Sequence, residues 1–246
     1  MMEASRTTRS RAAIALAALA AVLGFATAVA LSAHDADAKS AKVLGKTKKT
    51  PKSPCPGDSC RITVSVTGLQ TVADGEKAPF KVPASGHLVA WSVSLGKVNT
   101  EDDPNLVDSL NEDYGDIKAR LSVLKPKKRH RFKLAKQTPK VSLESRLGET
   151  PIYTLRKPLK VRKGLKIGLT MPGWLSAFTL GLDRDGNQWI ASRSDGECAE
   201  GQAKDAKPQQ KKGSVREYGC RFKGERLLYW AWFVKSGKGG KGGGQN

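Results

Sequence analysis

The chain has 246 residues, with 43 Lys and Arg against 23 Asp and Glu, a formal net charge of +20 and only three histidines. A surface this basic favours anionic partners, and so few imidazoles leave little material for Ser-His-Asp or Cys-His catalysis or for a His-based metal centre. We therefore expect no cofactor and no metal site. Carboxylate pairs that cleave polysaccharides leave no sequence signature, so that class of enzyme stays open as an alternative.

The N-terminus has the order of an export signal. Residues 1–11 carry three arginines, and residues 12–33 carry no charge. Small-residue sites follow, and we expect cleavage after Ala38, which makes residues 1–38 a signal peptide and the mature protein secreted or attached to the cell surface. The alternative is an uncleaved membrane anchor formed by residues 12–33.

Composition divides the remaining chain into three parts. Residues 39–54 hold six lysines and no acid, and residues 235–246 are rich in Gly and Lys. Both compositions are typical of disordered segments. The sequence therefore predicts a Lys-rich disordered linker, one folded domain over residues 55–234 and a disordered tail.

Apolar and polar residues alternate through most of that domain, which is the period of half-buried strands. In "GHLVAWSVSL", this alternation directs Val89, Trp91, Val93 and Leu95 inward and Ala90, Ser92 and Ser94 toward water. About ten short strands follow one another without a convincing helix. We expect an all-β fold, a single two-sheet β-sandwich of jelly-roll type.

The basic stretch "KPLKVRKGLKIGLTMP", residues 157–172, fits a β-hairpin that turns at Lys163-Gly164. Leu159, Val161 and Ile167 would then face the core, and the solvated face would carry Lys160, Arg162 and Lys166. These cations are interpreted as surface decoration rather than as a binding site.

One segment interrupts the strand pattern. Residues 100–116 contain seven acids and no base, and are predicted to form a long surface loop. Calcium prefers such clustered carboxylates, but a solvated acidic loop is the simpler interpretation.

The four cysteines all follow the signal. Three pairings are possible, and we favour local bridges that join Cys55 to Cys60 and Cys198 to Cys220. A zinc site is the alternative, although the second pair lacks the close spacing of zinc ligands.

Two segments are candidates for binding. The stretch "KPKKRHRFK" packs six cations and a histidine into residues 125–133, which suits phosphate, sulfate or uronate groups; otherwise it is a turn whose lysines give solubility. The predicted polyanion contacts are Lys125, Lys127, Lys128, Arg129, Arg131 and Lys133.

The second candidate is "RLLYWAWFV", residues 226–234, whose two faces are both apolar. Trp230 and Trp232 share one of these faces. They are core residues if that face is covered, and an aromatic platform for sugar rings if it is open.

The stretches "CPGDSCRITVSVTGLQ", "GHLVAWSVSLGK", "ARLSVLKP", "YTLRKPLKVRKG" and "RLLYWAWFV" resemble a group of exported proteins of high-GC Gram-positive bacteria with no assigned function. The resemblance implies export and a β-sandwich over most of residues 55–234, and transfers no activity or site residue. We expect an exported, non-catalytic module that binds envelope polysaccharide or another polyanion, with nucleic acid a less suitable partner. A structural envelope protein without a specific ligand is the alternative.

Overall fold

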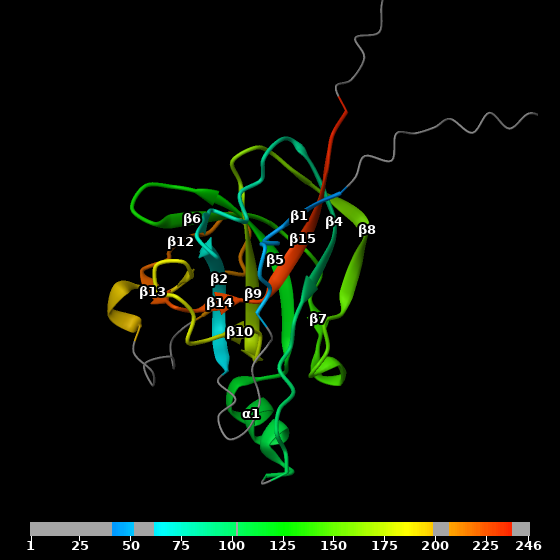
Figure 1. The fold of residues 1–246 in the computed structure, drawn as a ribbon, viewed down its shortest axis with the longest axis vertical. Helices are drawn as coiled ribbons and strands as arrows, with labels where there is room; N and C mark the ends of the chain where they lie inside the picture. The colour runs from blue at the N-terminus through cyan, green and yellow to red at the C-terminus, as the bar shows by residue number, and fades with distance from the viewer. Residues whose placement is uncertain (1–40, 52–61, 102, 199–206, 238–246) are drawn as a thin grey trace, which may run out of the picture. The chain divides into compact units, whose positions relative to one another are not determined.

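A computed structural model describes residues 41–51, 62–101, 103–198 and 207–237. The described chain is mostly β, with curled sheets in which every strand pair is antiparallel (Figure 1). The expected all-β class is therefore confirmed. The expected signal, residues 1–38, lies outside the described residues.

The small sheet has four strands, in the order β1-β15-β4-β8. Their bounds are Lys42–Leu44 for β1, Tyr229–Lys235 for β15, Gly86–Val93 for β4 and Ile152–Val161 for β8.

The large sheet has nine strands and follows the path β12-β6-β5-β9-β2-β11-β13. Two short strands lie off this path, β3 on β2 and β7 on β5, and β10 and β14 form a separate pair. The bounds are Thr63–Ala73 for β2, Glu76–Lys77 for β3, Lys118–Pro126 for β5, Arg131–Gln137 for β6, Val141–Ser142 for β7, Lys166–Leu175 for β9, Phe178–Thr179 for β10, Gln188–Ala191 for β11, Val215–Glu217 for β12, Cys220–Lys223 for β13 and Arg226–Leu227 for β14.

One hydrophobic core joins residues of both sheets. Trp91 of β4 and Leu169 of β9 belong to the same buried cluster. Tyr229 of β15 stacks on Phe80 with ring centroids 4.0 Å apart, and its hydroxyl donates to the Ile167 carbonyl of β9 at 2.9 Å. These contacts hold the faces of the two sheets against each other.

The acidic segment is not entirely a loop, which corrects that prediction. Leu106–Tyr114 forms helix α1, while two short 3-10 turns lie at Glu144–Arg146 and Asp195–Glu197. Leu106 and Leu110, one helical turn apart, pack on the core. The Trp174 indole donates to the Asn111 side chain at 3.0 Å. The spacing of Leu106 and Leu110 was the signal for this helix in the sequence, but the surrounding acids concealed the apolar face.

The hairpin predicted for residues 157–172 is wrong in its pairing. The turn is where we expected it, since Leu165 N donates to Arg162 O at 3.3 Å and Gly164 has φ +86°. However, β8 belongs to the small sheet and β9 to the large one. Alternation alone does not reveal this, because a β-arch between two sheets and a hairpin have the same period. We call residues Arg162–Leu165 the arch.

The expected disordered linker also needs correction. Lys42–Leu44 is strand β1, which pairs with β15 and places Val43 opposite Trp232. The Leu44 side chain is buried. An apolar pair inside a Lys-rich run is enough to add an edge strand.

Candidate anion-binding site

The basic segment 125–133 forms the tip of the β5–β6 hairpin. Lys127 N donates to Arg131 O at 2.8 Å, and Arg131 N donates to Lys128 O at 3.3 Å. The two residues at the turn, Arg129 and His130, have φ of 55° and 51°. Two successive positive φ angles define a type I′ turn, which normally takes Asn-Gly. Arg and His in this conformation strain the backbone at the tip.

Several cations of the tip surround an open hollow of about 490 Å³. The hollow is lined by Lys127, Lys128, Arg129, Arg131 and Val215. Its lining contains no carboxylate, hydroxyl or thiol, so the charged groups that it offers to a ligand are all cations.

The remaining two predicted residues lie next to this hollow. Lys125 and Lys133 are cross-strand partners on β5 and β6, and Val215 of β12 is opposite Lys133. Opposite residues of an antiparallel pair project from the same face of the sheet. The structure therefore brings all six predicted cations together on one exposed hairpin.

A loop closed by a disulfide positions β12 against the hairpin. The expected Cys198–Cys220 bridge is confirmed, whereas Cys55 and Cys60 lie outside the described residues. Within this loop, the buried Gln209 side chain donates to Phe132 O at 3.0 Å and accepts from the Tyr218 hydroxyl at 2.9 Å. Tyr218 N in turn donates to His130 O at 2.9 Å. The loop thus supports both the tip and the wall that carries Val215.

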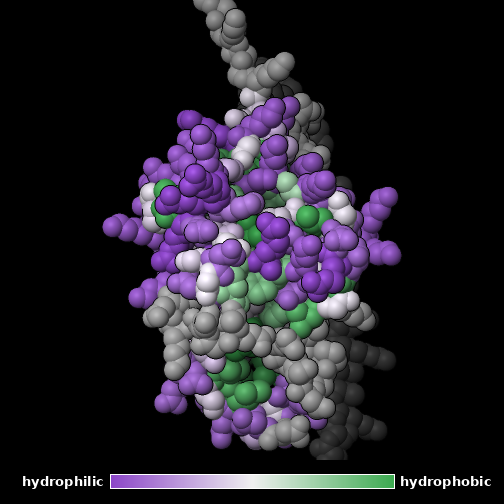
Figure 2. All heavy atoms as spheres, turned by 90° about the vertical axis from the view of Figure 1, so that its left-hand side faces the viewer, coloured by the Kyte–Doolittle hydropathy of each residue, from purple (hydrophilic) through white to green (hydrophobic). Residues whose placement is uncertain are grey.

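Few acids lie near the charges of the tip. Residues 77–100, 117–143 and 150–182 contain no Asp or Glu. In the part of the chain that the structure describes, none of the six cations forms an ion pair. Glu217 lies opposite Arg131 in the strand register, but the two side chains form no salt bridge. The upper part of the face in Figure 2, which includes the region of β6 and β12, is accordingly dominated by hydrophilic residues.

The acidic helix lies at the other end of the large sheet. Helix α1 packs near Trp174, close to the end of β9, whereas the first residue of β9, Lys166, pairs with Leu124 near the hairpin tip. Ten strand residues span about 30 Å. Since charges are screened over about 8 Å at physiological ionic strength, the acids of α1 do not compensate the basic tip.

The Trp pair lies on the outer face of the small sheet. Trp230 is opposite Ser92 and Trp232 is opposite Ala90. Both indoles are half-buried, and in the described ranges neither indole N–H donates a hydrogen bond. Ala90 and Ser92 are nevertheless buried, and this corrects the expectation that those two residues face water.

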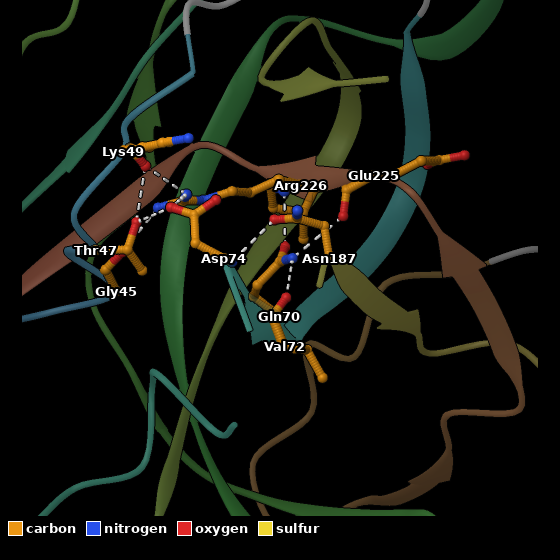
Figure 3. Close-up of polar contacts among 10 residues, drawn as sticks. Gly45, Thr47, Lys49, Gln70, Val72, Asp74, Asn187, Glu225 and Arg226 are labelled. Carbon is orange, nitrogen blue, oxygen red and sulfur yellow. Dashed lines mark hydrogen bonds and ion pairs between the residues drawn. The ribbon is translucent and has the colours of Figure 1, made fainter. Parts of the chain in front are cut away.

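Sequence reasoning missed a buried polar cluster around Arg226 (Figure 3). The Arg226 guanidinium, 2% exposed, lies 2.9 Å from an Asp74 carboxylate oxygen and donates to Gly45 O and Lys49 O. Thr47 donates to the same Asp74 oxygen at 2.5 Å. Burial lowers the pKa of Arg226, and Asp74 acts in the opposite direction. Because its donors are aimed at protein carbonyls and a carboxylate, this cluster fastens the segment after β1 to the body and offers no donors to a ligand.

No known family model, curated protein or solved structure matches this chain. Within the described ranges, no helix is long and apolar enough to cross a membrane. The same residues contain no cluster of three or more His, Cys, Asp or Glu that suits a metal ion.

Proposed function

We propose that this chain is an exported, non-catalytic module that binds anionic polymers of the cell envelope, and that the β5–β6 tip makes the principal contacts. The scaffold in this proposal is a two-sheet sandwich of jelly-roll type. Export rests on the charge pattern of residues 1–38.

The observation that carries the proposal is that none of the six tip cations forms an ion pair among the described residues. Several of these cations line an open hollow, and two residues of the tip hold the strained turn conformation. Backbone strain persists where the surrounding structure enforces it, and it is concentrated at binding sites. A turn needed only for solubility has no reason to place Arg and His where Asn-Gly relieves the strain.

The experiment is retention of purified residues 39–246 on anionic and neutral insoluble polysaccharides, at about 50 mM and about 500 mM salt. The test variant is Lys127→Glu/Arg131→Glu. The matched control is Lys97→Glu/Lys140→Glu, which makes the same charge change on exposed residues away from the tip.

We expect retention on anionic polymers at low salt, loss at high salt, and loss at low salt in the tip variant alone. Equal retention by the test and control variants would mean that net charge, rather than the tip, causes binding. No retention on any polymer favours a structural envelope protein, and release of soluble sugars favours the enzyme.

A second candidate is sugar stacking on Trp230 and Trp232. The observation behind it is that both indoles are half-buried and keep their N–H groups free among the described contacts, whereas the indoles of Trp174 and Trp189 donate hydrogen bonds at 3.0 Å. Retention on a neutral polysaccharide that survives high salt and disappears in Trp230→Ala/Trp232→Ala supports this candidate.

A further inference from the structure

We propose that the anion-binding surface continues from the tip across the end of the sheets to the β8–β9 arch, and that its ligand is a linear anionic glycopolymer or polyol phosphate rather than an isolated anion. This inference rests on the proposed function and specifies the ligand class.

The arch lies beside the tip at the same end of the large sheet. Lys166, the first residue of β9, pairs with Leu124 near the end of β5. Adjacent strands are about 5 Å apart, so Lys166, at the end of the arch, is one strand spacing from Leu124 of β5 and two from Leu134 of β6. In Figure 1, the β5–β6 hairpin and the loop between β8 and β9 both lie toward the top, opposite α1.

A second segment adds another cation to the arch. Lys81 forms a bridge with Lys166, while Val82 N donates to Leu165 O at 2.8 Å and Gly164 N donates to Val82 O at 2.9 Å. These bonds hold the Lys81 segment against Arg162 and Lys163. The arch and its neighbour thus form a second basic cluster of Lys81, Arg162, Lys163 and Lys166.

A hydrogen bond between the sheets connects the two clusters. The Lys136 ammonium of β6 donates to Lys160 O of β8 at 3.0 Å, so the tip strand lies against the strand that leads into the arch. Both residues are exposed, so each adds a positive charge near the contact between β6 and β8.

The second basic cluster contains no acid. None of its four cations forms an ion pair among the described residues. Burial, together with the charge of Lys81, lowers the pKa of Lys166. Like charges side by side destabilise the free protein, and a bound anion removes that repulsion.

The two clusters together match a chain rather than a single ion. Cations on one strand face repeat about every 7 Å, a spacing that suits successive charged groups of an extended polymer. Three large hydrophobic residues are exposed in the described part of the chain: Tyr114, Ile152 and Val215. Tyr114 is the only aromatic residue among them, and it lies in α1. Since single-stranded nucleic acids bind by stacking bases on aromatic rings, this surface favours a polymer without bases.

The test compares glycerol phosphate oligomers with one or two phosphates and with many, by calorimetry at low salt. The arch variant is Lys81→Glu/Lys163→Glu, both on exposed positions. It is compared with the tip variant Lys127→Glu/Arg131→Glu and the control Lys97→Glu/Lys140→Glu. Circular dichroism confirms that each variant is folded.

We expect the arch variant to weaken binding of the long oligomer by about tenfold or more and to leave the short ones unchanged, while the tip variant weakens both. If the arch variant equals the control at every length, this inference is overturned and the proposed function stands. If the tip variant also equals the control, the proposed function fails. Tighter binding of a single-stranded DNA with the same number of phosphates would overturn the assignment to a polymer without bases.

Discussion

Lys125 on β5 and Lys133 on β6 lie directly opposite each other, so their ammonium groups project from the same face of the hairpin. Neither forms an ion pair among the described residues. Such a pair is unfavourable in the free protein, and the strands tolerate it because the core beneath them is well packed, with Leu124 and Leu134 fully buried.

The first prediction concerns this repulsion. Lys133→Gln removes one charge and is expected to raise the free energy of unfolding by about 0.2–1 kcal/mol at low salt, with the gain lost at high salt because screening already weakens the repulsion. Urea denaturation at low and at high salt measures the change in the free energy of unfolding, with Lys97→Gln as the control. A gain that persists at high salt would show that repulsion is not its cause.

The second prediction concerns the strained turn. Arg129→Asn/His130→Gly gives the type I′ turn its preferred residues and is expected to raise the free energy of unfolding by about 1–2 kcal/mol. The same variant removes the Arg129 cation from the hollow and is expected to weaken anion binding. Thermal or urea unfolding checks the first effect and retention checks the second. A less stable variant would contradict the assignment of strain.

The third prediction concerns Arg226. Arg226→Met leaves Asp74 without its cation and removes the donor that Arg226 supplies to Gly45 O, so we expect the free energy of unfolding to fall by about 3 kcal/mol or more. Asp74→Asn is expected to lower the free energy of unfolding by less, because the amide oxygen still accepts from Arg226. Asn also tolerates the backbone φ of 48° at position 74. Urea denaturation measures both variants.

Hydrogen exchange locates the Arg226 effect. Amides of β1 and its following segment are expected to exchange faster in Arg226→Met, because the guanidinium holds Gly45 O and Lys49 O. Unchanged protection of these amides would contradict the role of Arg226 in holding the segment after β1 against the rest of the domain.

The fourth prediction concerns the disulfide. Cys198 and Cys220 are 22 residues apart, and in the chain-entropy model a loop of this length contributes about 3 kcal/mol. Cys198→Ala/Cys220→Ala is expected to lower the free energy of unfolding by this amount and to make the loop more susceptible to trypsin, which can cleave after Lys211 and Lys212 within it. Anion retention is expected to fall less than in the tip variant, because the cations themselves remain. Unchanged stability would show that the non-covalent contacts of the loop, such as those of Gln209, are enough to hold it in place.

Alternation predicted the all-β class, whereas proximity along the chain predicted the Cys198–Cys220 bridge and the grouping of the six tip cations. Alternation did not predict that β8 and β9 belong to different sheets, since period alone does not specify the pairing partner. The arch cations were therefore interpreted as decoration of a hairpin. The Arg226–Asp74 pair joins residues 152 positions apart, and a single sequence carries no signal for such a contact.

The measurement that tests the central claim most directly is the salt dependence of binding to an anionic envelope polymer, for residues 39–246 and for the tip and control variants. Binding through cations releases counterions, so the logarithm of affinity falls linearly with the logarithm of salt concentration, with a slope set by the number of contacts. We predict a steep slope for the parent protein, a clearly shallower one for Lys127→Glu/Arg131→Glu and an almost unchanged one for Lys97→Glu/Lys140→Glu. Equal slopes for the two variants would contradict a binding site at the β5–β6 tip.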